Sequence, residues 1–249
     1  MNLLIVPIIL PSATAVVLLL LSRASTTGRL LATASALIQV PIAGLILERS
    51  YEQVVVLPLG NWAAPFGIVL VSDMLTALML VASSLVGLAA IMATTGERES
   101  KEVHPLRFPL MMTLIAGANL AFLTGDLFNL FVAFEVLLIS SYALMTLEAD
   151  DRRFPGAMPY VAINLFGSQV FIIVCGLCYG LLGTLNFAQI AQRAEAYINE
   201  PMLATIGVLL LMVVGIKAGL FPLYFWLPKS YAVLPTAVFA LFAGLMTKV

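Results

Sequence analysis

Hydrophobic residues occur along this chain in long blocks separated by short polar or charged segments. Eight such blocks can be delimited, at residues 3–21, 30–47, 74–93, 110–123, 127–147, 158–182, 202–221 and 235–249. A helix needs about 20 mostly apolar residues to cross a bilayer, and most of the blocks reach or approach that length. The pattern therefore predicts an all-α polytopic membrane protein with about eight transmembrane helices.

Two segments between the blocks have their own pattern. Residues 54–59 and 68–71 are short β-branched runs around the turn residues of 60–67, which is typical of a β-hairpin. We expect this hairpin, within about 51–71, to lie outside the bilayer. Residues 186–199 are polar enough to form a helix on the membrane surface.

The last two blocks are irregular. Gly215, Gly219 and Pro222 weaken the end of block 202–221 and predict a broken seventh helix. Irregular backbone at membrane depth is tolerated where it lines a cavity or packs on protein. The eighth block has only 15 residues and no polar flank, so we expect its span to be cut short, by a natural truncation or in a partial sequence.

Composition supports the membrane class. The chain is 62% hydrophobic and 10% charged, whereas soluble domains are about 25% charged. A net charge of -1 gives no reason to expect nucleic acid as a partner. The single histidine and two cysteines offer no metal-ligand cluster, and we expect no metal ion or organic cofactor. The first block has no basic segment before it, so it is expected to be a permanent span rather than a signal peptide.

Basic residues in the loops predict an orientation. If successive loops lie on alternate sides, one side carries eight basic residues: Arg23, Arg29, Arg98, Lys101, Arg107, Arg152, Arg153 and Lys229. The other side carries two, Arg49 and Arg193. Cytoplasmic loops are enriched in Lys and Arg, so the N-terminus and the hairpin are predicted to be extracytoplasmic, in a multi-pass protein of the cell membrane.

Three charged residues lie inside the apolar blocks: Glu135, Lys217 and Lys248. Charge at bilayer depth costs several kcal/mol and usually marks an ion or proton path. The pKa of a lysine falls on burial and rises beside a carboxylate, so a Glu–Lys pair with variable separation can switch proton affinity. We predict that Glu135 and Lys217 form such a pair, and that Lys248 passes the proton onward.

Each of these residues also has a structural interpretation. Glu135 can make a helix-packing hydrogen bond as the protonated acid, and the two lysines can extend to an interface.

Other polar residues can support the same path. Asn164 and Ser168 lie one turn apart in the sixth block, where they line a hydrated path or bond between helices. Asp126 and Asp73 precede the fifth and third blocks, where the helix dipole favours an acid; of these two, Asp126 is a candidate for the path.

Several stretches resemble the antiporter-like membrane subunits shared by Mrp-type cation/proton antiporters and respiratory complex I. They are residues 59–73, the segment Thr-Gly-Asp-Leu-Phe-Asn-Leu-Phe-Val-Ala-Phe-Glu at 124–135, and residues 215–228. Complex I relatives typically read His-x-Trp-Leu-Pro-Asp-Ala-His after the broken helix. Here residues 224–231 are Tyr-Phe-Trp-Leu-Pro-Lys-Ser-Tyr, so the resemblance is to the D-type subunits of the Mrp antiporters. It places the essential acid and lysines of the family at Glu135, Lys217 and Lys248, although Lys229 departs from the usual pattern.

The resemblance implies the organisation of the chain. Residues 1–105 would hold helices 1–3 with the hairpin, and residues 106–249 would hold helices 4–8 of the first antiporter-like repeat, truncated at the C-terminus.

It also implies a function. The chain would be a non-enzymatic subunit of a hetero-oligomeric antiporter complex, with other antiporter subunits and lipid as partners and with Na⁺ and H⁺ as transported ions. Two alternatives stay open. One is a proton-pumping membrane subunit of NADH:quinone oxidoreductase or a membrane-bound hydrogenase, and the other is an inactive truncated subunit with a structural role.

Overall fold

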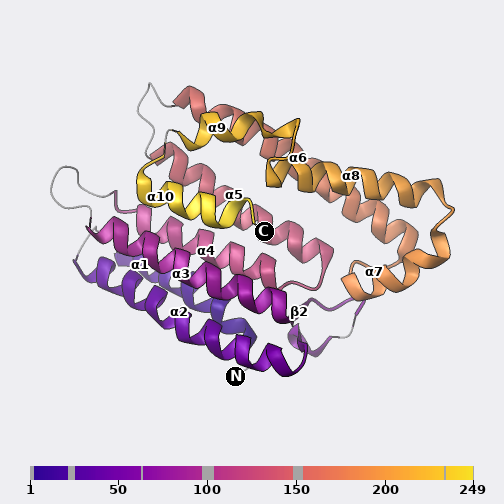
Figure 1. Cartoon of the computed structure of the whole chain (residues 1–249), viewed down its shortest axis with the longest axis horizontal. Coiled ribbons are helices and arrows are strands. Elements are labelled where there is room, and N and C mark those ends of the chain that lie inside the picture. The colour runs from indigo at the N-terminus through magenta and orange to yellow at the C-terminus, as the bar shows by residue number, and fades with distance from the viewer. Residues whose placement is uncertain are drawn as a thin grey trace.

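The computed structural model describes residues 3–21, 26–62, 64–96, 104–147, 154–232 and 234–248. Most of them are helical, and Figure 1 shows the long helices side by side. The long helices are α1 (Val6–Leu21), α2 (Thr26–Glu52), α3 (Met74–Gly96), α4 (Arg107–Leu123), α5 (Leu127–Leu147), α6 (Phe154–Leu182) and α8 (Pro201–Ala218). The short helices are α7 (Phe187–Ala194), α9 (Trp226–Tyr231) and α10 (Thr236–Leu241).

Six helical segments are long and apolar enough to cross a membrane: Leu3–Leu21, Thr26–Glu52, Met74–Thr95, Leu127–Leu147, Ala157–Leu182 and Pro201–Tyr231. The other two expected spans coincide with shorter apolar helices, Arg107–Leu123 and Thr236–Met246. The 17 residues of α4 rise about 26 Å, less than the roughly 30 Å of a hydrocarbon core. In the described part of the chain, six of the eight expected spans are therefore long enough.

The predicted hairpin is confirmed as a two-stranded sheet. Strand β1 (Val55–Pro58) pairs antiparallel with β2 (Val69–Ser72), with Val55 opposite Ser72. We call the end of the bundle that carries this sheet the sheet end, and the opposite end, where α1 ends and α2 begins, the far end. The predicted surface helix corresponds to α7 and the 3-10 turn Glu195–Tyr197, and α7 lies close to the sheet in Figure 1.

Strand β2 and the α4–α5 and α6–α7 connections are hydrogen-bonded to one another at the sheet end. The Gly125 N–H donates to the Val69 carbonyl (2.8 Å), and the Leu127 N–H donates to the Leu185 carbonyl (2.8 Å). A Cβ on Gly125 would lie 2.7 Å from Cγ2 of Val71, so the α4–α5 connection approaches β2 this closely only with glycine. These bonds fix where α5 begins.

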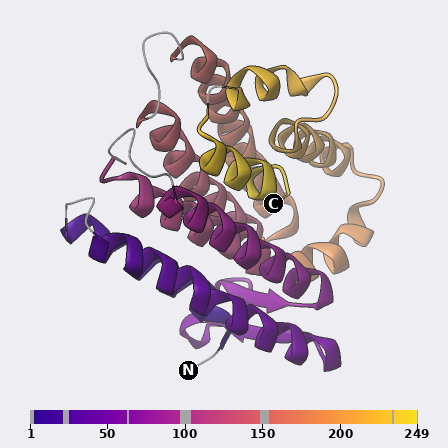
Figure 2. The same ribbon diagram turned by 60° about the vertical axis from the view of Figure 1, so that its left-hand side comes forward.

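A buried polar network joins the first four helices. The Asn119 side chain of α4 donates to the Pro7 carbonyl and to Oε1 of Gln39, both at 2.9 Å. The Ser83 hydroxyl donates to Oδ1 of Asn119 at 2.7 Å. Figure 2 shows α2 along one edge of the bundle, whereas α3 lies in its middle and packs against the C-terminal helix α10, drawn in yellow.

Part of the charge pattern that predicted the orientation lies outside the described residues. This part consists of Arg23, Arg98, Lys101, Arg152 and Arg153. The extracytoplasmic position of the N-terminus and of the sheet therefore stays a prediction.

Candidate proton-transfer site

Lys217 is buried in the last turn of α8, with 5% of its surface exposed. Its ammonium donates to the Ser168 hydroxyl of α6 at 3.4 Å. It also lies 5.3 Å from the centroid of the Phe134 ring of α5. The charge is thus enclosed between three helices and does not extend to the bundle surface.

The predicted break in the seventh helix lies directly after Lys217. Helix α8 ends because Gly219 adopts a left-handed conformation, with φ of 66°. The Leu220 N–H closes this end by donating to the Gly215 carbonyl at 2.9 Å. The Trp226 indole then donates to the Ile216 carbonyl at 3.2 Å. Backbone groups freed by the break are therefore bonded inside the protein, as membrane depth requires.

Glu135 follows Phe134 on α5 and is half-buried. Its Oε1 is buried and has no hydrogen-bond partner among the described residues. The carboxylate nevertheless interacts electrostatically with Lys217 and with Tyr142. The acid and the lysine thus interact by charge, while Oε1 of the acid is not bonded to the ammonium.

The two polar residues of α6 differ in what they contact. Asn164 and Ser168 are both 2% exposed. Ser168 contacts Lys217, whereas the Asn164 amide donates to the Tyr160 carbonyl of its own helix at 3.0 Å. Gly167 permits the close approach of α6 to α8, because a Cβ there would lie 3.3 Å from Cγ2 of Ile216.

Asp126 is located away from this cluster, at the sheet end. Its Oδ1 accepts from the Asn129 N–H at 2.9 Å and so caps α5, the role expected for an acid at a helix start. Burial raises the pKa of the Asp126 carboxyl, although the backbone N–H groups of Asn129 and Phe128 oppose the shift. Nine residues separate Asp126 from Glu135, a rise of about 13 Å along the helix.

Lys248 is exposed and is also separate from Lys217. Its ammonium donates to the hydroxyl of Thr247 at 2.7 Å, just after the π-helical turn Phe242–Met246. Together they line an open depression with Leu227, Pro228, Tyr231, Ala232, Phe239 and Ala243. The end of the chain lies midway along the bundle in Figure 1.

Sequence reasoning missed a group of aromatic residues beside the site. The hydroxyls of Tyr160 and Ser141 are 2.6 Å apart. The Tyr160 ring contacts the rings of Trp226 and Tyr142, with centroids 5.2 and 5.5 Å away. Tyr142 and Tyr160 lie in apolar segments, where an aromatic side chain gives no signal that separates it from ordinary core.

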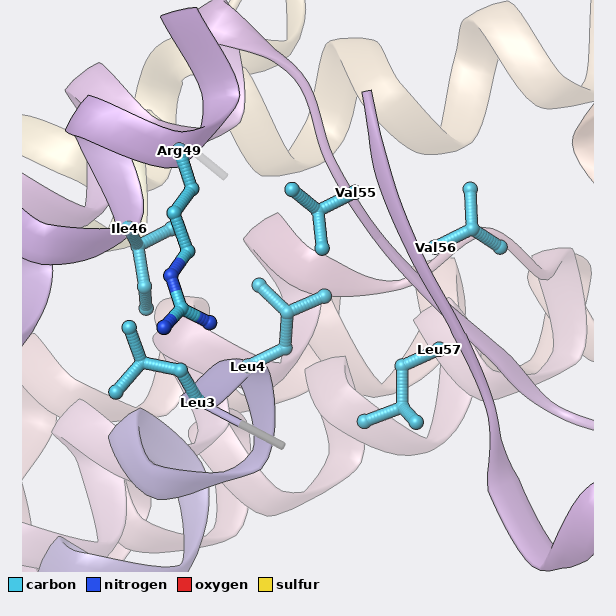
Figure 3. Close-up of a pocket in the computed structure, with 7 residues that line it drawn as sticks. All are labelled: Leu3, Leu4, Ile46, Arg49, Val55, Val56 and Leu57. Carbon is cyan, nitrogen blue, oxygen red and sulfur yellow. The ribbon is translucent and has the colours of Figure 1, made fainter. Parts of the chain in front are cut away.

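A small pocket at the sheet end is distinct from this site. It is lined by Leu3, Leu4, Ile46, Arg49, Val55, Val56 and Leu57. In Figure 3 the guanidinium of Arg49 extends toward Leu3 and Leu4. Its lining is otherwise apolar and contains no acid, so the pocket lacks the groups of a proton-transfer site.

Comparison with known proteins places this geometry in a family. Residues 124–249 match the family model described as NADH:quinone oxidoreductase/Mrp antiporter, transmembrane. A curated relative, the D-type subunit of the Na⁺/H⁺ antiporter of Alkalihalophilus pseudofirmus, is 41% identical over 253 residues, which cover all of this chain and 50% of the relative. The chain thus spans about half the length of the curated relatives that it matches.

Two solved structures show the same fold. The Mrp complex from Dietzia sp. DQ12-45-1b matches 98% of this chain with a TM-score of 0.87 and 34% identity, over 46% of its own chain. The membrane-bound sulfane sulfur reductase, an archaeal respiratory membrane complex, matches 98% with a TM-score of 0.90 and 27% identity, over 50% of its own chain. Since the family model covers half of the sequence and includes Glu135, Lys217 and Lys248, the chain belongs to the NADH:quinone oxidoreductase/Mrp antiporter transmembrane family.

Proposed function

We propose that the chain is a membrane subunit of a monovalent cation/proton antiporter complex, as its relatives among the D-type antiporter subunits are. In this proposal Na⁺ is exchanged for H⁺, and the partners are the other subunits of the complex and the surrounding lipid. The sheet end faces away from the cytoplasm, in keeping with the loop charges. Residues 1–105 precede a first antiporter-like repeat that begins at about residue 106.

The observation that carries the proposal is the enclosure of Lys217. An ammonium held between the Ser168 hydroxyl and the Phe134 ring is shielded from bulk water. Its charge is favoured by the carboxylate of Glu135. When Glu135 takes up a proton, this attraction is lost and Lys217 releases its own proton. Lys248 receives the proton at the open depression and passes it onward, and Asn164 and Asp126 support the path.

A second candidate function has a specific observation in its favour. The TM-score to the archaeal respiratory complex, 0.90, is as high as that to the Mrp complex. A proton-pumping subunit of a redox-driven complex would use the same buried charges without exchanging Na⁺. Dependence on Na⁺ therefore separates the two functions.

The test is proton exchange in everted vesicles from a host without its own antiporters. The host carries this gene with the genes of its full complex, and an acid-loaded vesicle reports proton efflux by dequenching of a dye after Na⁺ is added. We expect dequenching with the wild type and a loss of about 100-fold or more with Glu135→Gln, the lower end of what a positioned acid–base group contributes.

The matched control is Glu200→Gln, because Glu200 is exposed and makes no side-chain cap to α8. It is expected to exchange like the wild type. An assembled wild-type complex that shows no Na⁺-dependent dequenching would contradict the antiporter proposal and favour the redox-driven pump.

A further inference from the structure

Two buried oxygen atoms on one face of α5 have no partner. They are Oε1 of Glu135 and the hydroxyl oxygen of Tyr142, which among the described residues make no hydrogen bond. Glu135 and Tyr142 are seven residues apart, which is close to two full turns of an α-helix. Their side chains therefore lie on the same face, and the two residues are about 10 Å apart along the helix axis. The charge of Glu135 acts on Tyr142 across this interval.

Buried polar groups in native proteins are bonded to protein or to ordered water. Two or three waters at ordinary hydrogen-bond lengths span about 10 Å, which is the rise along the helix axis from residue 135 to residue 142. A water that bridges two such groups satisfies both. Among the described residues, each of these two oxygens therefore has its bonding capacity free for a water.

The neighbouring tyrosines do not offer a free hydroxyl. The hydroxyl of Tyr160 lies 2.6 Å from that of Ser141, and the Tyr231 hydroxyl donates to the Phe242 carbonyl at 3.4 Å. The ring of Tyr142 packs edge-on against that of Tyr160, with an interplanar angle of 77°. Within this cluster, packing holds the Tyr142 ring in place while its hydroxyl is left for another partner.

The position of Tyr142 gives such a bridge of waters a direction. Helix α5 starts at Leu127 at the sheet end and ends at Leu147, so Tyr142 lies between Glu135 and the far end. We propose that Tyr142 is a relay residue that joins Glu135, through bridging waters, to the far end of the bundle; this inference rests on the proposed function. The hydroxyl accepts one proton from water as it donates its own to the next water, so the side chain is unchanged after each transfer.

The first test is Tyr142→Phe in the assembled complex, which removes only the hydroxyl. We expect the maximal exchange velocity to fall about 100-fold, the lower end of what a positioned proton-transfer group contributes, while the apparent KM for Na⁺ stays close to that of the wild type. The matched control is Tyr179→Phe on α6, because Tyr179 is 48% exposed. A wild-type velocity in Tyr142→Phe, or an equal loss in Tyr179→Phe, would overturn the relay.

A second variant is 3,5-difluorotyrosine at position 142, which keeps the shape of the ring and makes the hydroxyl more acidic. A relay residue predicts that the alkaline limb of the velocity–pH curve moves to lower pH. A purely structural tyrosine predicts an unchanged curve, which would overturn the relay even if the phenylalanine variant fails to assemble.

Glu135→Gln in the same vesicles distinguishes failure of the relay from failure of the proposed antiporter function. Loss of exchange in Glu135→Gln together with a wild-type velocity in Tyr142→Phe would overturn the relay alone. Absence of exchange in the wild type would overturn the proposed function and the relay with it.

Discussion

Lys217 shows how an apolar bundle tolerates a charged side chain. The Ser168 hydroxyl accepts a hydrogen bond from the Lys217 ammonium, and the Phe134 ring presents its face to the ammonium. A cation over an aromatic face gains about 0.5–2 kcal/mol, depending on how far it is desolvated. Glu135 adds the attraction of an opposite charge. Each contact comes from a different position on α5 or α6, so the site depends on how these helices pack against α8.

Charge inside apolar runs was enough to identify Glu135 and Lys217 as candidates, and helical spacing was enough to nominate Ser168. The same reasoning could not identify Phe134 or Tyr142. An aromatic residue in an apolar run is compatible with core, lipid or a cation, and only the packing of α5 against its neighbours distinguishes these. The roles of Glu135, Lys217 and Lys248 in transport stay predictions.

Asp73 allows a pH prediction outside the spans. Its Oδ1 accepts from the Thr76 N–H at 2.8 Å, and this bond holds the pKa of Asp73 below its ordinary value. Because the pKa is lower in the folded chain than in the unfolded one, the stabilisation is complete above the unfolded pKa. It is lost as the pH falls through the folded pKa.

We therefore expect the thermal stability of the wild type in detergent to fall more steeply in acid than that of Asp73→Asn, whose amide keeps a cap acceptor without charge. The difference between the two melting curves over the acid range isolates Asp73. Parallel acid dependence in the two proteins would contradict this role.

At the scale of elements, the sequence pattern predicted the hairpin and the helix break but not their limits. Helix α8 was expected to reach residue 221 and ends at Ala218, because Gly219 takes a left-handed conformation. The hydropathy of Leu220 and Phe221 suggested a longer helix, although both are exposed. Hydropathy indicates that a segment prefers an apolar environment, but it does not indicate where a helix ends. Here the backbone conformation of Gly219 determines the end of α8.

The break itself predicts the effect of Gly219→Ala. A left-handed conformation costs an L-residue about 1–2 kcal/mol, and the added Cβ would lie 3.0 Å from Cδ1 of Leu227. We expect lower thermal stability by about that amount and a larger loss of exchange, because α9 must shift relative to Lys217. Gly207→Ala is the matched control within α8, since its Cβ would meet nothing within 4 Å. Equal behaviour of the two variants would argue that the break does not position the site.

At the scale of the molecule, the sheet end organises the helices. The α4–α5 connection is hydrogen-bonded to β2 and to the α6–α7 connection. These bonds bring segments about 60 residues apart in the chain into one layer. Sequence analysis could not foresee these pairings, because each connection has only a few residues and no strand pattern. Six of the eight expected spans are long enough to cross a membrane, and α4 is too short by length alone.

The orientation of the whole molecule can be tested on one helix. Thr26 and Glu52 are the first and last residues of α2, and both are exposed. With Cys175 and Cys178 replaced by alanine, an impermeant maleimide should label Glu52→Cys in intact cells. Thr26→Cys should be labelled only after permeabilisation, because the positive-inside rule places the far end in the cytoplasm. The reverse pattern would contradict the proposed orientation.

The central claim is that Glu135 and Lys217 act as one coupled pair. The most direct measurement is a double-mutant cycle on Na⁺-dependent proton exchange, with Glu135→Ala, Lys217→Ala and the double variant in the assembled complex. Coupled neighbours show interaction energies of about 0.5–3 kcal/mol, so the double variant should lose clearly less than the product of the single losses. The control pair is Glu135→Ala with Lys229→Ala, because Lys229 is an exposed lysine on α9. This double variant should lose exchange by the full product of its two single losses. Wild-type exchange in both single variants, or a double variant at the full product of losses, would contradict the coupled pair.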